Sequence, residues 1–437
     1  MSSISVSSPQ HQYLRNGTLV VSLGVVVGFI CDYLFNLTLS RTLESHTYGD
    51  YKVAYAFATT ASVFCLLGGD RIAPRLLSER LARGENQHVW YFLKFYLIVA
   101  MVTSFTVILL TAIGSYFHLG VTDTQDHHPL LKMSFVIPLI AVGALLSRIL
   151  QSAKQLAWSN LPWRIGLPLA KIGAIWVMFY SLPSLTLSEV ILAGATTVVV
   201  IIAWQWHKIR QLNLVDVEAH HDTAPATEWL KLSIPMMLAM LVTMVMNQVD
   251  LFMLEAMATE HEVGVFAAAS TTAHFIPIIQ TTVAGLFLPL IAPAIANDGD
   301  GGFQLFKKGM LWVSVAVILV CGVLFLSSHV LLGLFGDDYT EANMTLYLLI
   351  GAYGIWGVAS FSSTWLQYLK RSHLVLKIGG VALLVDVVAN LLLIPPLGIE
   401  GAALATLLAL GSAALLTLLA MFNVMRAGVF TVKSALK

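Results

Sequence analysis

Three aspartates lie inside long apolar runs, and each has an asparagine one helical turn away. The pairs are Asp32–Asn36, Asn247–Asp250 and Asp386–Asn390. Residues three or four positions apart share one face of an α-helix, so each pair should present a carboxylate and an amide side by side. A face of this kind can line an aqueous cavity, bind a proton or Na⁺, or hydrogen-bond sugar hydroxyls.

The composition indicates what surrounds these carboxylates. Of the 437 residues, 57% are hydrophobic and only 11% are charged, whereas about a quarter of the residues of a soluble globular protein are charged. Apolar stretches of about 20 residues recur along the chain, and each is long enough to cross the roughly 30 Å hydrocarbon core of a bilayer. The sequence therefore predicts an all-α polytopic membrane protein.

Hydropathy predicts about twelve transmembrane helices. The expected spans are 17–40, 50–69, 89–113, 132–153, 163–182, 187–206, 231–254, 263–293, 309–334, 344–368, 374–394 and 399–421. The longest connection, 207–230, separates six spans from six. We therefore expect a tail at 1–16, an N-lobe at 17–206, a linker at 207–230 and a C-lobe at 231–437.

The basic residues give the expected orientation of these spans. If the N-terminus is cytoplasmic, all but three of the 24 lysines and arginines fall on the cytoplasmic side, the exceptions being Arg41, Lys52 and Lys132. Retention of basic residues in the cytoplasm is the usual signal of membrane topology. An even number of spans then places both termini in the cytoplasm.

The spans also set the expected depth of the carboxylates. Asp32 and Asp250 fall in the outer part of the membrane, and Asp386 falls near its middle. A charged side chain at the centre of a span costs about 2.5–3.5 kcal/mol on insertion scales, so it usually faces a cavity or a partner. We interpret Asp386 as functional. For Asp32 and Asp250, a structural role in capping or bridging helices is an open alternative.

Short matches recur in the same order in the two halves. "LQSAK" at 150–154 matches "LQYLK" at 366–370, and "KIG" occurs at 171–173 and again at 377–379. The segment 182–193 matches 394–405. An Asp followed by a Gly-x-aromatic motif also occurs in each half, and it aligns Gly49 with Gly264. Two repeats that both start in the cytoplasm are a transporter architecture, in which rocking of the two lobes alternates access to a central cavity.

Several of these stretches resemble a known family. "YGDYKVAYAFATTASVF" and "LGGDRIAPRLLSERLARGE" resemble the first helical hairpin of polysaccharide (oligosaccharide-lipid) flippases, as does "NQVDLFMLEAMATEHEVGVFAAAS" in the second half. "LLGLFGDDYTEANMTLYLLIG", "LQYLKRSHLVLK" and "ANLLLIPPLGIEGAALATLLA" come after it in the expected order. These flippases belong to the multidrug/oligosaccharidyl-lipid/polysaccharide (MOP) superfamily, and the resemblance extends over essentially the whole chain.

The resemblance implies a MATE-like fold of twelve helices in two pseudo-symmetric lobes. It also implies a function: moving a lipid-linked oligosaccharide from the inner to the outer leaflet of the bacterial inner membrane. The product would feed O-antigen, capsule or exopolysaccharide biosynthesis, with a polysaccharide polymerase or other assembly proteins as partners beside the membrane lipids. No cofactor and no nucleic acid are expected, although H⁺ or Na⁺ could couple to transport.

Two cations could bind the headgroup of such a lipid. Arg148 lies about one to two turns from the cytoplasmic end of the fourth span. Lys171 is about halfway across if the fifth span begins at Pro162, and near the inner surface if it begins after Pro168. Arginine binds phosphate in bidentate geometry, which suits a diphosphate. The alternative is that both side chains snorkel to the interface.

Two other functional classes compete with the flippase. A cation-coupled multidrug or metabolite antiporter of the same superfamily would use the carboxylates for cation exchange, and it is the alternative to the flippase. A membrane enzyme would need catalytic groups on a sizeable outer loop, but every expected outer loop is short, and the sequence has no nucleophile constellation and no nucleotide-binding loop. We expect neither catalytic residues nor a metal site.

Overall fold

Helices account for the regular structure of this chain, because a backbone that crosses a bilayer must satisfy its hydrogen bonds within each segment. The computed structural model describes residues 8–117, 129–181, 185–216, 225–296 and 301–426, and within them the side chains from Leu23 onward except those of Thr243, Pro289, Ala292 and Ala296. Within those ranges it contains helices and turns and no strand. The expected tail at 1–16 and linker at 207–230 lie partly outside the described residues.

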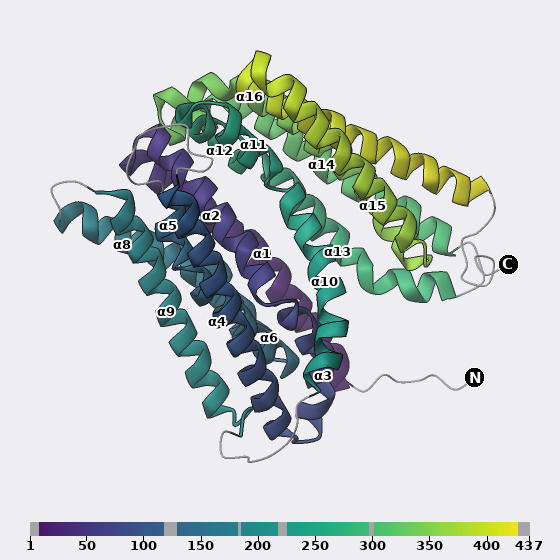
Figure 1. Ribbon diagram of the computed structural model, residues 1–437. Coiled ribbons are helices and arrows are strands. Elements are labelled where there is room, and N and C mark those ends of the chain that lie inside the picture. Colours follow the sequence, from purple (N-terminus) through teal and green to yellow (C-terminus); the bar gives the residue numbers. More distant parts are fainter. Residues whose placement is uncertain (1–7, 118–128, 182–184, 217–224, 297–300, 427–437) are drawn as a thin grey trace. The chain divides into compact units, whose positions relative to one another are not determined.

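Sixteen α-helices succeed one another along the described chain (Figure 1). They are α1 (Ser8–Thr42), α2 (Ser45–Cys65), α3 (Gly69–Ala82), α4 (Asn86–Tyr116), α5 (Pro129–Ser134), α6 (Ile137–Ser152), α7 (Leu156–Leu161), α8 (Leu167–Ser181), α9 (Leu187–Gln211), α10 (Ala226–Met246), α11 (Val249–Met257), α12 (Glu260–Ala273), α13 (Phe275–Ala296), α14 (Gly301–Phe335), α15 (Asn343–Tyr368) and α16 (Ser372–Arg426). A π-helical turn, Pro162–Gly166, joins α7 to α8, and a 3₁₀ helix, Asp337–Ala342, precedes α15.

Nine helical segments of the described chain are long and apolar enough to cross a membrane, or ten if α2 and α3, bent by 48°, form one span. The 55 residues of α16 contain non-helical backbone at Gly398. A straight helix of that length would extend about 80 Å, more than twice the hydrocarbon thickness. The last two expected spans, 374–394 and 399–421, therefore both lie in α16. The chain is a multi-pass helical membrane protein, and the count of twelve stays a prediction.

The chain forms two compact units. Unit 1 contains α1, α2 from Asp50 onward, and every helix from α3 through α10, ending at Gln248. Unit 2 contains Glu44–Gly49, the first turn of α2, together with α11 to α16. These units differ from the lobes expected from the sequence, because α10 belongs to unit 1 and the first turn of α2 belongs to unit 2. The division into lobes at 207–230 stays a prediction.

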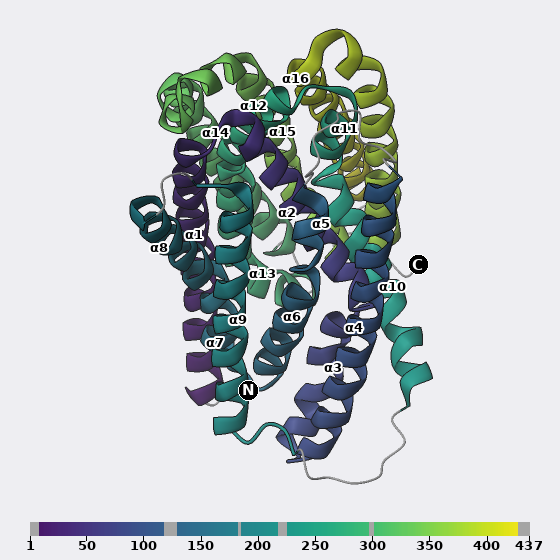
Figure 2. The same ribbon diagram turned by 60° about the vertical axis from the view of Figure 1, so that its left-hand side comes forward.

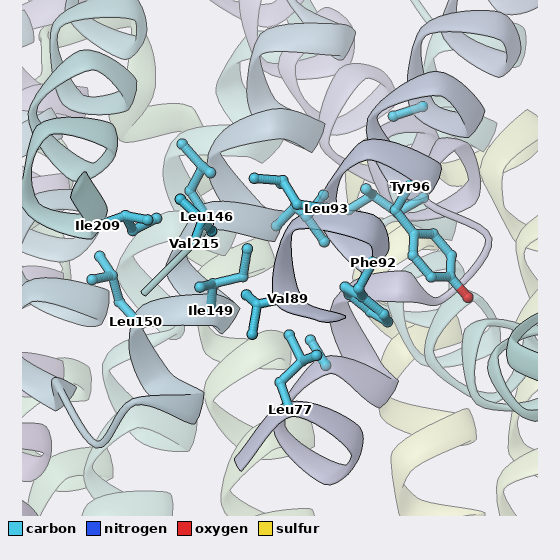
Figure 3. Packing of buried hydrophobic residues seen from close by; sticks show 14 of the residues in the cluster. Leu77, Val89, Phe92, Leu93, Tyr96, Leu146, Ile149, Leu150, Ile209 and Val215 are labelled. Carbon is cyan, nitrogen blue, oxygen red and sulfur yellow. The ribbon is translucent and has the colours of Figure 1, made fainter. Parts of the chain in front are cut away.

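Helix α6 lies at the centre of unit 1 and packs against α3, α4, α7 and α9 (Figure 2). The core between these helices is formed by fully buried side chains such as Leu77, Phe92 and Ile149 (Figure 3). Trp229 of α10 adds its ring to this core, with its centroid 5.3 Å from that of Phe92. Close interdigitation of this kind is what holds helices together where lipid removes the usual hydrophobic driving force.

The first turn of α2 packs within unit 2 through Ser45, Tyr48 and Gly49. Ser45 Oγ lies 2.7 Å from His261 Nδ1, and the fully buried ring of Tyr48 packs on Phe335 and Tyr339 at centroid distances of 6.3 and 6.0 Å. Gly49 and Gly264 face one another there, so the backbones of α2 and α12 come into direct contact. The two glycines paired by the sequence repeat are thus in contact in the structure.

We expect Gly264→Ala to destabilise this crossing, because the new Cβ would overlap the carbonyl oxygen of Ser45. Overpacking of a close contact costs about 1–3 kcal/mol, so the melting temperature of the detergent-purified protein should fall by several degrees. Gly411→Ala on α16 is the control, because no heavy atom of the described residues lies within 4 Å of a Cβ at that position. Equal melting temperatures for the two variants would contradict the tight crossing.

Candidate functional site

A cavity of about 560 Å³ lies within unit 1, lined by α2, α3, α5, α6, α7, α8 and α9, the π-helical turn and the end of α10. Its charged lining residues, among those the structure describes, are Arg71, Arg148, Arg164, Lys171 and a single carboxylate, Asp70. Tyr51, Tyr55 and Trp163 contribute aromatic faces. Four cations against one carboxylate make the cavity suited to an anionic ligand that also presents apolar surface.

Three arginines and one aspartate of this cavity form what we call the arginine group: Arg71, Arg148, Arg164 and Asp70. Arg71 Nε lies 2.9 Å from Asp70 Oδ2, and the Asp70 side chain is only 4% exposed. Arg148 Nη1 donates to Gln151 Oε1 at 2.6 Å. The charges that act on Arg148 are those of Arg71, Asp70 and Arg164. Asp70 offsets only one of the three guanidinium charges.

The π-helical turn positions two of the cations. Pro162 begins the turn, and Pro168 lies in the first turn of α8. A π-turn inserts an extra residue into the helix and rotates the residues beyond it, and such turns are frequent at functional sites. Here Arg164 lies within the turn and Lys171 lies one helical turn into α8, and both line the cavity.

Lys171 is buried, with 7% of its surface exposed. Its Nζ lies 3.3 Å from the hydroxyl of Tyr51, 4.9 Å from the ring centroid of Phe35 and 4.5 Å from that of Tyr55. Cation–π contacts of this kind stabilise a desolvated ammonium by up to about 2 kcal/mol. Burial of this depth does not fit a side chain that snorkels to the interface.

The first predicted carboxylate–amide pair forms as expected. Asn36 Nδ2 donates to the backbone carbonyl of Asp32 at 2.7 Å and to its Oδ2 at 3.3 Å. Lys52 Nζ donates to Asn36 Oδ1 at 3.1 Å. Asn36 is buried, whereas the Asp32 side chain is exposed within the protein. Asp32, Lys52 and Lys171 interact electrostatically in unit 1.

The other carboxylates meet in unit 2, in what we call the carboxylate cluster: Asp250, Asp386, Asn390 and Thr406. Asn390 Nδ2 lies 2.7 Å from Asp250 Oδ1 and 3.2 Å from Asp386 Oδ1, and Thr406 Oγ1 donates to Asp250 Oδ2 at 2.8 Å. Asp386, Asn390 and Thr406 are buried, and the two carboxyl groups contact each other. The predicted Asp386–Asn390 pairing is confirmed.

The predicted pairing of Asn247 with Asp250 is wrong. Helix α10 ends at Met246 and α11 begins at Val249, so no continuous helix connects the two residues. Asn247 lies in the turn between them, where its side chain is exposed and its backbone N–H donates to Met244. Asp250 instead lies in the first turn of α11, and its amide partner is Asn390 of α16.

Several residues of these sites were not predicted from the sequence. Arg71 was grouped with basic residues that set topology, and Lys52 with the few outer cations. The other site residues that the sequence did not predict are Arg164, Asp70, Tyr51, Tyr55 and Thr406. The prolines at 162 and 168 were the available signal for a break near Arg164, whereas no local pattern distinguishes Thr406 from other threonines in apolar runs.

We expect Thr406→Val to destabilise unit 2. The substitution keeps the shape of the side chain but removes a hydrogen bond to a carboxylate, and such a bond contributes about 1.5–3 kcal/mol. Thr417→Val is the matched control, because Thr417 is a buried threonine on the same helix with no acidic hydrogen-bond partner among the described residues. Thermal melting of both purified variants would test the prediction, and a larger loss at Thr417 would contradict it.

A family model described as "Polysaccharide biosynthesis protein" matches residues 14–295. This match covers more than half of the chain, including both residues of the Asp32–Asn36 pair and every cation of the unit 1 cavity. It ends before Asp386, Asn390 and Thr406. No curated protein sequence matches the chain significantly.

Solved structures share the fold over nearly the whole chain. The lipid II flippase MurJ, in an inward closed conformation, gives a TM-score of 0.71 at 15% identity over 96% of this chain and 89% of that one. An inward-facing multidrug resistance MATE family transporter of the MOP superfamily gives 0.74 at 13% identity over 94% and 95%. A MATE transporter from Vibrio cholerae gives 0.60 at 15% identity over 95% and 99%. The expected MATE-like fold is confirmed.

Proposed function

Because the chain belongs to the polysaccharide biosynthesis protein family, we propose that it is a flippase. It would move an isoprenoid-diphosphate-linked oligosaccharide from the inner to the outer leaflet of a bacterial inner membrane by alternating access, for the assembly of a surface polysaccharide. Its partners would be that lipid, the surrounding membrane lipids and a polymerase or other assembly proteins. Both termini would lie in the cytoplasm.

The observation that carries this proposal is the charge of the unit 1 cavity. Three arginines and Lys171 face one buried carboxylate there, and a cation excess in a membrane protein requires a compensating anion. A diphosphate provides one and offers the oxygen geometry that guanidinium groups bind in pairs. The cavity, about 560 Å³ in volume, is in the size range of small-ligand sites and has aromatic faces for sugars. Arg148 and Lys171 are the headgroup-binding residues expected from the sequence.

The carboxylate cluster of unit 2 supports coupling to a cation. Two carboxyl groups in contact can share a proton. The same cluster also offers oxygen ligands, the donor type that hard cations such as Na⁺ prefer. The buried Asn390 Oδ1 has no hydrogen-bond donor among the described residues, so it is available to such a cation. We propose that Asp250, Asp386 and Asn390 bind the coupling ion, with Thr406 as a fourth oxygen. Asp32 and Asn36 would keep the unit 1 path polar, and Asn247 has no structural support for a role in the ion site.

The alternative function is cation-coupled export of drugs or metabolites. The carboxylate cluster would serve it equally well, because an antiporter exchanges its cargo for H⁺ or Na⁺. The unit 1 cavity distinguishes the two functions. Its arginines repel the cationic amphiphiles that multidrug transporters commonly export, whereas they attract a lipid diphosphate. We therefore favour the flippase.

We expect cells that lack this protein to accumulate carrier-linked oligosaccharide and to lose the corresponding surface polymer. The measurement is mass spectrometry of extracted polyprenyl-linked glycans, alongside analysis of the surface polysaccharide. Normal levels of both, in cells with no redundant transporter, would overturn the flippase in favour of the antiporter.

In the same cells, Arg148→Gln should fail to restore the polymer at wild-type protein levels, because it removes a guanidinium of the diphosphate site. Lys94→Gln is the matched control. Lys94 is exposed on α4 and does not line the cavity, so it should restore the polymer fully. Full restoration by Arg148→Gln would contradict the assignment of the arginine group.

We expect Asp386→Asn to uncouple transport from its driving ion. The amide cannot take up a proton and is a weaker ligand for Na⁺, so proteoliposome flipping should lose its response to an imposed pH or Na⁺ gradient. Asp338→Asn, at an exposed position of the 3₁₀ helix, should keep the response. An Asp386→Asn protein that responds like wild type to both gradients would exclude the carboxylate cluster as the coupling site.

A further inference from the structure

Lys171 is a buried cation whose charge is poorly compensated. Its single hydrogen-bond partner among the described residues is the Tyr51 hydroxyl, at 3.3 Å. An ammonium has three N–H donors, so the remaining stabilisation of this one comes from the Phe35 and Tyr55 rings. A buried charge normally has an ionic partner or several hydrogen bonds. Because Lys171 lines the cavity, its missing partner can be a bound ligand.

The charges around Lys171 differ from those around the arginine group. Asp32 and Lys52 act on Lys171, whereas Arg71, Asp70 and Arg164 act on Arg148. Lys171 and the arginine group therefore have different charged neighbours. A diphosphate held by the arginine group would leave the region of Lys171 with two lysines and one exposed carboxylate, Asp32, and hence with a net positive charge.

The aromatic side chains beside Lys171 suit a sugar. Tyr51 and Tyr55 lie one helical turn apart on α2, and their rings are nearly parallel, with centroids 5.9 Å apart and an interplanar angle of 8°. Both line the cavity. The two rings stack on one another, and together they bring aromatic edges and two hydroxyls to the cavity wall beside Lys171, groups that can contact the C–H groups and hydroxyls of a sugar.

We propose that the transported glycan is acidic, and that Lys171, Tyr51 and Tyr55 form a subsite for a sugar that carries a carboxylate. The sugar lies beside the tyrosine side chains, and its carboxylate accepts hydrogen bonds from the Lys171 ammonium. The arginine group holds the diphosphate. This inference rests on the proposed flippase function and assigns Lys171 to the glycan instead of to the headgroup.

The sequence repeat provides a matched control for Lys171. Lys377 occupies the same place in the second "KIG" motif, but its side chain is exposed. The burial of Lys171 is therefore not a property of the motif itself. Lys377→Met removes the same charge from the equivalent repeat position without touching the unit 1 cavity.

The test uses the purified full-length protein and two synthetic probes, a short polyprenyl diphosphate bearing glucose and the same lipid bearing glucuronic acid. Dissociation constants would be measured in detergent. We expect wild type and Lys377→Met to bind the glucuronosyl lipid about tenfold more tightly, the effect of one well-placed charge pair. Lys171→Met should bind both lipids equally, with an affinity for the glucosyl lipid within about twofold of wild type. Lys171→Gln is a second variant that lacks the charge, and melting temperatures compared with that of wild type show whether each variant is folded.

Three results would overturn the subsite. Equal binding of the two lipids by wild type would exclude an acidic sugar as the preferred ligand. Equal loss of affinity for both lipids in Lys171→Met would mean that Lys171 binds the diphosphate. Failure of correctly folded wild type to bind either lipid would overturn the flippase function itself. Arg148→Gln should weaken binding of both probes to the same extent, and this is the pattern of a residue that binds the diphosphate.

Discussion

A charge placed inside a membrane-spanning helix must find a partner, and this requirement explains both sites of the protein. An uncompensated ion in a low-dielectric medium costs several kcal/mol. In unit 2 the protein supplies the partners itself, because Asn390 and Thr406 donate to the carboxylates. In unit 1 it does not, because three arginines and a buried lysine share one carboxylate among the described residues of the cavity. The carboxylates of unit 2 thus have partners within the protein, whereas in the proposed function an anionic ligand would balance the cations of unit 1.

Interrupted helices position the side chains of both sites. The π-helical turn at Pro162–Gly166 precedes Lys171 and contains Arg164, and the break after Met246 places Asp250 at the start of a new helix. The kink between α2 and α3 has left-handed backbone at Leu67 and Gly68, just before Asp70. Broken helices are tolerated at membrane depth where protein or an aqueous cavity surrounds them. Each of the three breaks lies next to a charged residue of one of the two sites.

Sequence reasoning was reliable for what a single helix determines. The apolar runs predicted the helical membrane fold, and the four-residue spacing predicted that Asp386 pairs with Asn390. Spacing cannot say which helices pack together, so the meeting of Asp250 with Asn390 across 140 positions was not predicted. An argument from spacing also assumes an unbroken helix, and the predicted pairing of Asn247 with Asp250 is wrong because the helix is broken between them. Arg71 was missed because a basic residue near a span end has the same sequence signature whether it faces lipid headgroups or a cavity.

The two halves share sequence motifs but differ in charge. The lysine of "KIG" is buried against aromatic rings in unit 1 and exposed in unit 2, while the aspartate near the start of each half is exposed in unit 1 and held by Asn390 and Thr406 in unit 2. In the proposed function, unit 1 would bind the anionic cargo and unit 2 would bind the driving cation. Binding of one ligand would then change the affinity for the other only through a coupling free energy between the two sites, and that coupling is reciprocal.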